Sequence, residues 1–226
     1  MNSTTALGSP SSMPSLYDRL APLYDVVYGL GLQPGRRRAM AAMAVRAGER
    51  VLEVGIGTGL GALTYPAGVS VVGIDLSAAM LRRAAHRFRR PPQAHVALAR
   101  MDAGALALPD DTFDAVYAPY MVNVVPDPVA VGRELRRVCR PGGRVVLLNH
   151  FAGAGAASPV VDRLAGRIAA RLGDVDWDID LGTFLAGSGL AALSVERVNF
   201  AGVSTLVVCR VPSRTLHPPC PSKEVS

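Results

Sequence analysis

Apolar positions along this chain change repeatedly between two periods. Seven short apolar runs have the composition of strands, and between several of them apolar residues recur every three or four positions, as on one face of a helix. The alternation predicts an α/β domain built on a doubly wound, mostly parallel sheet of seven strands, with helices on both faces. The last two strands are separated only by Ala201 and Gly202, so we expect them to form an antiparallel hairpin. The predicted strands are 50–54, 70–74, 95–100, 113–118, 144–149, 193–200 and 203–210, and the predicted helices are 35–46, 78–89, 128–138 and 160–172.

Composition limits the number of domains and the compartment. The 226 residues are 50% hydrophobic, which is enough for one large core, and no internal linker or repeat divides them. We predict one domain over 15–211, in which 15–47 form helices that cover the site, and disordered tails rich in Ser, Pro and Thr over 1–14 and 212–226. No run of eighteen uncharged apolar residues occurs. We therefore expect a cytoplasmic protein, soluble or peripherally attached to the inner face of a membrane.

One glycine-rich turn carries the strongest chemical signal. Residues 51–59 read VLEVGIGTG, so Gly55, Gly57 and Gly59 follow an apolar strand that contains the acid Glu53. Glycines at alternate positions let a strand turn sharply towards a helix, and they let backbone N–H groups approach a ligand that any Cβ would hold away. The turn therefore favours a nucleotide-like cofactor.

The spacing around this turn selects among cofactors. A dinucleotide fingerprint needs glycine at position 60, where this chain has Leu60. Glu53 would repel phosphates but suits a ligand with a cationic amino acid portion. Asp75 ends the next apolar run about twenty residues on, where an acid can accept both ribose hydroxyls. A tight loop and a helix-capping Asp75 would explain the single features, but not their combination.

This stretch resembles motifs I and II of the class I S-adenosylmethionine-dependent methyltransferases. The resemblance implies a Rossmann-like fold and S-adenosylmethionine as cofactor. Asp102 and Ala103 follow the third strand and would contact the adenine edge, although Asp102 could instead cap the following turn. Met80 would pack on the adenine face or in the core, and Tyr120 would reach the methionine end of the cofactor or the acceptor. The implied cofactor-binding residues are Glu53, Gly55, Gly57, Gly59, Asp75, Leu76, Met80, Asp102, Ala103 and Tyr120.

Other segments narrow the resemblance to a subclass. The Tyr-Asp pairs at 17–18 and 24–25 resemble the entry helices of quinone-biosynthesis C-methyltransferases. The same front, together with MDAGALALPDDTFDAV, NVVPDP, RVCRPGG and LLNHF, is similar to the bacterial phosphatidylethanolamine N-methyltransferases of the Rhodobacter type. This similarity implies N-methylation of a phospholipid, with Tyr24, Asn149 and His150 as catalytic candidates. Asp114 and Pro141-Gly142-Gly143 are interpreted as structural.

The arginine clusters of the chain indicate which kinds of partner it could bind. The net charge is +6, and Lys223 is the only lysine, so nearly all the basic charge is arginine, clustered at 36–38, 82–83 and 87–90. Such clusters hold phosphates or lie against an anionic bilayer, or they are solvated helix faces. The segment 15–32 has apolar residues at near-helical spacing and could lie on a membrane or only cover the site, since Pro22 interrupts it. No aromatic interleaving accompanies the charge, so we expect no nucleic acid partner.

Cysteine usage predicts neither disulfides nor a metal site. Cys139, Cys209 and Cys220 are odd in number and lack the spacing of metal ligands or redox pairs. No obligate protein partner is inferred either. Three hypotheses remain open from the sequence: a phospholipid N-methyltransferase, a C- or O-methyltransferase for a quinone precursor or another small molecule, and a non-catalytic cofactor-binding or lipid-surface protein.

Overall fold

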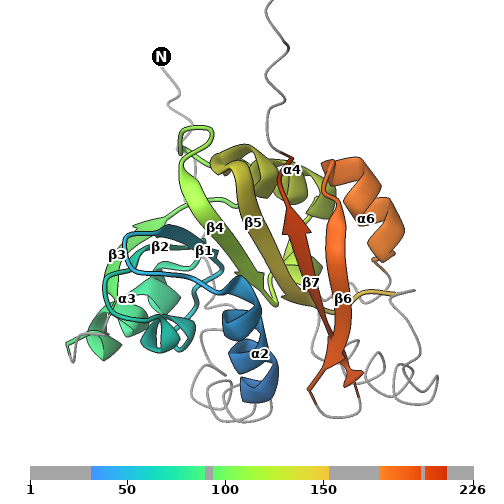
Figure 1. Ribbon diagram of the computed structural model, residues 1–226. Helices are drawn as coiled ribbons and strands as arrows, with labels where there is room; N and C mark the ends of the chain where they lie inside the picture. The colour runs from blue at the N-terminus through green and yellow to red at the C-terminus, as the bar shows by residue number, and fades with distance from the viewer. Residues whose placement is uncertain (1–31, 90–93, 153–178, 200–201, 213–226) are drawn as a thin grey trace, which may run out of the picture.

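The computed structural model describes residues 32–89, 94–152, 179–199 and 202–212, and these ranges contain one seven-stranded sheet (Figure 1). The strand order is β3-β2-β1-β4-β5-β7-β6. The first five strands are parallel, and β7 pairs antiparallel with both β5 and β6, so the predicted sheet and its terminal hairpin are confirmed. The strands are β1 (Arg50–Val54), β2 (Ser70–Asp75), β3 (His95–Arg100), β4 (Phe113–Pro119), β5 (Cys139–Asn149), β6 (Ala192–Val198) and β7 (Ser204–Arg210).

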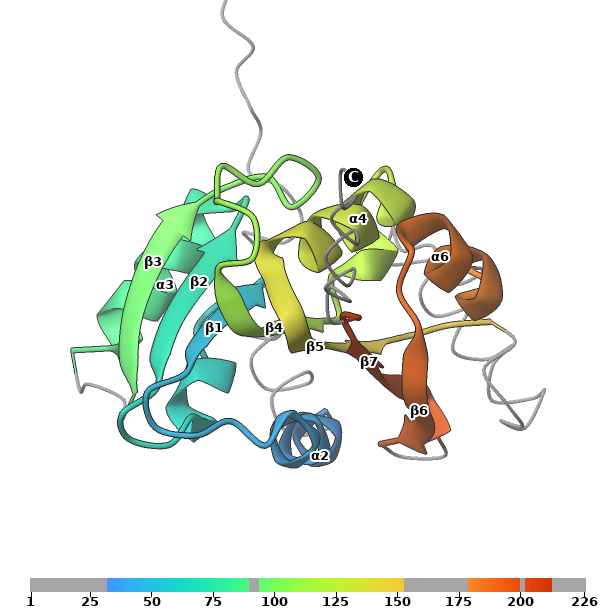
Figure 2. The same cartoon turned by 45° about the horizontal axis from the view of Figure 1, so that its top comes forward.

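Helices cover both faces of the sheet because side chains of each strand alternate between two cores. Leu52 and Val54 of β1 join a core that includes residues of α4 and α6, whereas Val51 joins a core with α2 and α3 on the opposite face (Figure 2). The helices are α2 (Gln33–Met43), α3 (Ala78–Arg87), α4 (Pro128–Val138) and α6 (Leu181–Ser188), and the short 3₁₀ turns are η1 (Gly61–Thr64) and η2 (Val122–Val124). The glycine turn thus leads into a short 3₁₀ turn rather than a long helix.

Two element boundaries differ from the sequence prediction for a visible reason. Helix α2 ends at Met43, three residues before the predicted end, because Ala44 adopts a left-handed φ of 45°. The Arg144 side chain donates to the carbonyls of Met43 and Ala44 and also pairs with Glu49. Strand β5 begins at Cys139 rather than at Arg144, with a register irregularity opposite Phe113/Ala115. The Pro-Gly-Gly segment therefore forms an irregular part of a strand, not a separate turn.

Helix α6 has no counterpart in the prediction. Its sequence, LGTFLAGS, contains two glycines and no charge, so the amphipathic pattern is weak. Its first turn is held by Asp180, whose side chain accepts from Thr183 N, and Gly189 ends it at a φ of 66°. Gly132 of α4 brings the two helices close, since a Cβ there would lie 2.5 Å from Ser188 Cβ. The predicted helix 160–172, both predicted tails and the segment 15–31 lie outside the described residues.

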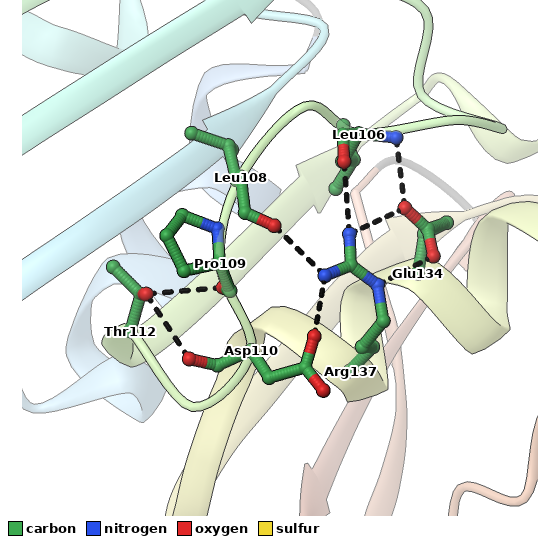
Figure 3. Close-up of polar contacts among 7 residues, drawn as sticks. All are labelled: Leu106, Leu108, Pro109, Asp110, Thr112, Glu134 and Arg137. Carbon is green, nitrogen blue, oxygen red and sulfur yellow. Dashed lines mark hydrogen bonds and ion pairs between the residues drawn. The ribbon is translucent and has the colours of Figure 1, made fainter.

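One arginine organises the loop between β3 and β4. Arg137, in the last turn of α4, donates to both carboxylate oxygens of Glu134, to Asp110 and to the carbonyls of Leu106 and Leu108 (Figure 3). Glu134 in turn accepts from Leu106 N at 2.8 Å. Glu134 and Asp110 raise the pKa of the Arg137 guanidinium, and the hydrogen bonds from Arg137 lower the pKa of the Glu134 carboxyl. The network fixes the loop that carries Asp102.

Replacing Arg137 with alanine should loosen this loop. We expect Arg137→Ala to lower the free energy of unfolding by about 2 kcal/mol, because two backbone carbonyls and two carboxylates lose a charged donor. Urea unfolding at pH 7 measures the change. Arg136→Ala removes an exposed arginine from the same helical turn and should cost less than about 0.5 kcal/mol. Equal losses in both variants would contradict the assigned role of the network.

The cysteines and acids of the described chain show no metal or redox centre. Cys139 and Cys209 are buried free thiols, and burial raises the pKa of each to about 12. Within the described ranges, no group of His, Cys, Asp and Glu side chains is arranged to hold a metal ion. Asp114 accepts from Arg50 N at 2.7 Å and pairs with Arg140 at 2.6 Å, which is the structural role predicted for it.

Candidate functional site

The strand order reverses between β1 and β4, and the loops that follow these two strands meet. β1 is flanked by β2 on one side and by β4 on the other, with Glu53 opposite Tyr117 in register. A Cβ added to Gly55 would lie 2.9 Å from Met121 Cβ, so the glycine loop contacts the residues after β4. Ligands of doubly wound sheets bind at this reversal, beyond the carboxyl ends of the strands.

The glycine loop uses its own N–H groups to fold back on β2. Gly55 N and Ile56 N both donate to Ile74 O, Gly57 N donates to Asp75 Oδ2 at 2.9 Å, and Gly59 N donates to Ile56 O. The three glycines have φ values of 74°, 57° and 80°. The expectation that these N–H groups face a ligand is therefore not what the structure gives. The surroundings of two of the glycines differ: a Cβ on Gly57 would meet no atom within 4 Å, whereas one on Gly59 would lie 2.7 Å from Phe88 Cζ.

Asp75 is held at the end of β2 by two backbone donors. Its Oδ2 accepts from Gly57 N and its Oδ1 accepts from Ser77 N at 2.8 Å. Burial raises the pKa of this carboxyl, and the backbone donors oppose the rise. Ser77, not Asp75, caps α3 by accepting from Met80 N. Each Asp75 oxygen has a second lone pair, so the carboxylate can accept two ribose hydroxyls.

Four other predicted cofactor residues lie after β2 and β3. Leu76 is 62% exposed although it is a large apolar residue, which suits contact with a ligand. Met80 is nearly buried on α3. Asp102 is exposed, and its Oδ1 accepts from Gly104 N at 2.8 Å, so it forms the turn that the sequence offered as the alternative. Ala103 packs partly against the core. The contacts of these residues with adenine stay predictions.

Glu53 is a buried acid with an unpartnered oxygen. It is 2% exposed, and its Oε2 has no hydrogen-bond partner; the buried hydroxyls of Tyr65 and Tyr117 lack one as well. Burial raises the pKa of Glu53 to about 7, against the opposing influence of the Tyr65 hydroxyl and the Arg36 guanidinium. A Cβ on Gly61 would lie 2.4 Å from Glu53 Oε1, so the carboxyl also needs a glycine beside it. An orphaned buried oxygen of this kind is typical of a site that receives a donor from a ligand.

Tyr120 lies at the carboxyl end of β4 in a strained conformation. Its φ is 54°, which costs on the order of 1–3 kcal/mol in a non-glycine residue. The strain is held by Tyr120 N, which donates to Leu148 O at 2.7 Å, and by the Tyr120 hydroxyl, which accepts from Asn199 Nδ2 at 2.9 Å. The guanidinium carbon of Arg36 lies 5.6 Å from the centroid of the Tyr120 ring. Non-glycine strain of this type clusters at functional sites.

The remaining candidates differ in what their polar groups contact. Asn149 is fully buried; its Oδ1 accepts from Val122 N and its Nδ2 donates to Ala118 O. His150 is half-buried, with its ring centroid 6.2 Å from that of Tyr120, and its Nδ1 faces Val203 O. A carbonyl oxygen only accepts, so the neutral ring carries its hydrogen on Nδ1 and keeps Nε2 as the basic nitrogen. Tyr24 lies outside the described residues.

Comparison with known proteins identifies the family. Residues 52–147 match the family model described as a methyltransferase domain. A phosphatidylethanolamine N-methyltransferase of Cereibacter sphaeroides is 44% identical over 165 residues, which cover 73% of this chain and 79% of that protein. This chain belongs to the S-adenosylmethionine-dependent methyltransferases.

One more distant relative and one solved structure extend the comparison. A 2-phytyl-1,4-naphtoquinone methyltransferase of Synechococcus elongatus is 36% identical over 151 residues, which cover 62% of this chain and 64% of that protein. A solved structure of phosphoethanolamine N-methyltransferase 2 from Haemonchus contortus, in complex with S-adenosylmethionine, shares the fold with a TM-score of 0.68 at 18% identity, over 87% of this chain and 57% of that chain. The fold, the enzyme class and the cofactor predicted from the sequence are confirmed.

Two features of the structure itself fit S-adenosylmethionine as the cofactor of this methyltransferase. The orphaned Oε2 of Glu53 suits the ammonium group of a methionine moiety, and the open space at Gly57 leaves room for a ligand against the loop. The sequence did not reveal Tyr65, Tyr117 or Asn199 as neighbours of the site. Tyr117 reaches Glu53 only through the β1–β4 register, and Asn199 reaches Tyr120 over 79 residues of chain.

Proposed function

We propose that this methyltransferase adds methyl groups to the ethanolamine amine of phosphatidylethanolamine, towards phosphatidylcholine, at a membrane surface. The observation that carries the proposal is the 44% identity to a phosphatidylethanolamine N-methyltransferase across 79% of that relative. The quinone methyltransferase relative is less similar and is covered to 64% of its length. A quinone precursor is therefore the second candidate acceptor.

Several side chains have defined tasks towards the cofactor under this proposal. When bound, S-adenosylmethionine supplies a methyl group already activated on a sulfonium, so no covalent bond to the protein is needed. Glu53 would receive the ammonium group of the methionine portion, and Asp75 would accept the ribose hydroxyls from the position set by Gly57 N and Ser77 N. Gly57 would lie against the cofactor, because a Cβ at this position would meet no protein atom within 4 Å.

The acceptor amine requires a proton acceptor. An ethanolamine head group arrives mainly as an ammonium ion and must lose a proton before its lone pair can attack. His150 is the proposed acceptor, because the contact of Nδ1 with Val203 O makes Nε2 the basic nitrogen of the neutral ring. Asn149 would act by positioning, since both of its polar groups bond to backbone around the end of β4. Tyr24 stays a predicted catalytic residue of the preceding segment.

Membrane contact stays a prediction of the basic and amphipathic front. In the ranges that the structure describes, no helix is both long and apolar enough to cross a bilayer. The exposed arginines Arg37 and Arg38 on α2 follow directly on the segment 15–32, and Arg38 already pairs with Glu196 at 3.0 Å. Arginines beside an amphipathic segment favour an anionic lipid surface.

Transfer of labelled methyl groups into liposomes tests the proposal. We expect label in mono-, di- or trimethylated head groups when liposomes contain phosphatidylethanolamine and an anionic lipid, with the products resolved by mass. Liposomes of phosphatidylcholine and the same anionic lipid are the control. Transfer to a demethylated naphthoquinol but not to phosphatidylethanolamine would contradict the proposed acceptor and favour the quinone alternative.

A further inference from the structure

Asn199 connects three parts of the fold beside the proposed transfer site. It follows β6 with a left-handed φ of 65°, a conformation that asparagine adopts more readily than most residues. Its Oδ1 accepts from Gly35 N at 2.7 Å, at the start of α2. Its Nδ2 donates to the Tyr120 hydroxyl at 2.9 Å and to Ser204 Oγ at 2.8 Å. One amide therefore links α2, the end of β4 and the start of β7.

The direction of these hydrogen bonds follows from the chemistry of their partners. A backbone N–H can only donate, so the oxygen of the Asn199 amide must face Gly35 and the NH₂ group must face the two hydroxyls. The Tyr120 oxygen is consequently an acceptor towards Asn199. Ser204 Oγ accepts from Asn199 Nδ2, and Ser204 lowers the pKa of Tyr120, as a hydroxyl that donates to the same phenolic oxygen does. The phenolic hydrogen of Tyr120 is thereby directed away from both residues.

Arg36 places a positive charge over the Tyr120 ring. The Arg36 guanidinium is stacked over Tyr120 and is close enough to Glu53 and Tyr117 to affect the pKa of each. A hydroxyl hydrogen next to a guanidinium is a site for an anionic oxygen. We propose that Asn199 is a positioning residue that turns the Tyr120 hydroxyl into a hydrogen-bond donor for an anionic oxygen of the methyl acceptor. Resting on the proposed function, this oxygen belongs to the phosphodiester of the lipid; in a quinol acceptor it would be a phenolate.

An isosteric substitution separates the bond of Asn199 to α2 from its bond to the Tyr120 hydroxyl. Asn199→Asp keeps the oxygen that accepts from Gly35 N, and so keeps the anchor of α2. Its second oxygen can only accept, so the Tyr120 hydroxyl would reverse and donate to it, losing its hydrogen for the acceptor. Tyr120→Phe removes the same donor directly. Glu196→Gln is the matched control, because it removes the charge from the exposed contact of Arg38 on α2 with β6 without touching Asn199.

Binding and kinetics together decide the proposal. The protein is loaded with S-adenosylhomocysteine. We then expect glycerophosphoethanolamine to bind about tenfold more weakly to Asn199→Asp and to Tyr120→Phe than to the wild type. The double variant should show the same tenfold loss as each single variant. The KM for phosphatidylethanolamine should rise by the same factor, while the Kd for S-adenosylhomocysteine stays within twofold and Glu196→Gln behaves as the wild type. The proposal would be overturned if the double variant bound glycerophosphoethanolamine more weakly than either single variant, or if the variants also bound S-adenosylhomocysteine more weakly.

A failure of the proposed acceptor would be visible separately. If the wild type methylates a demethylated naphthoquinol and binds no glycerophosphoethanolamine, the phospholipid function fails. The same variants are then compared on the naphthoquinol. If Asn199→Asp, Tyr120→Phe and the double variant all raise the KM for the naphthoquinol by the same factor, the role of Asn199 is supported. An unchanged KM overturns it.

Discussion

Gly57→Ala is expected to weaken cofactor binding roughly 100-fold while leaving the protein folded. Gly57 has a φ of 57°, so the alanine costs about 1–2 kcal/mol of stability in a left-handed backbone. Its Cβ meets no protein atom within 4 Å and instead projects into the space proposed for the cofactor. A steric conflict of about 3 kcal/mol there corresponds to roughly 100-fold weaker binding. Calorimetric titration with S-adenosylmethionine, beside thermal unfolding, measures both effects.

Gly59→Ala is the matched comparison within the same loop. Its φ of 80° carries a similar backbone cost, but its Cβ would lie 2.7 Å from Phe88 Cζ and 3.2 Å from Ala84 Cβ. We expect this variant to lose about 2–4 kcal/mol of stability, because the Phe88 ring must move. If Gly57→Ala instead lost stability as Gly59→Ala does and bound the cofactor normally, the cofactor would not lie against Gly57.

Glu53→Gln is expected to stabilise the protein and weaken cofactor binding. Burial raises the pKa of Glu53 from 4.5 to about 7, so the folded state binds more protons than the unfolded state between these values. The free energy of unfolding therefore falls as pH rises through this window, and the penalty is complete above about pH 7. Its size is at most about 3 kcal/mol, which glutamine removes because it carries no charge. The melting temperature at pH 8 should rise by about 3–8 °C, with little change at pH 4.5.

The effect of Glu53→Gln on binding should run in the opposite direction. A carboxylate that accepts from an ammonium group contributes about 1.5–3 kcal/mol, so the Kd for S-adenosylmethionine should rise about 10–100-fold. The wild-type affinity should increase between pH 5.5 and 7.5 as Glu53 ionises, and the variant should lose this dependence. Glu196→Gln, at an exposed carboxylate, should change neither stability nor affinity. Unchanged affinity in Glu53→Gln would place the ammonium group elsewhere.

Local patterns were sufficient to predict the sheet and the cofactor loop. The strands around Glu53 and Asp75 are short, apolar and β-branched, and their periodicity depends on neighbours in sequence alone. The glycine spacing and the two acids predicted the cofactor for the same reason. Where the pattern was weak, as in LGTFLAGS of α6, prediction failed, because that helix is stabilised by packing of Gly132 against Ser188 and by its cap.

The sequence by itself determined the fold class, the methyltransferase family and the residues of the glycine loop. Only the tertiary structure decided that the N–H groups of Gly55, Ile56 and Gly57 bond to β2. It also decided that Glu53 has an orphaned oxygen beside Tyr65 and Tyr117, and that Asn199 contacts Tyr120. These contacts join residues far apart in the chain through strand register and crossover connections. Sequence periodicity carries no information on register between distant strands, and burial, which sets the pKa of Glu53, exists only once they pair.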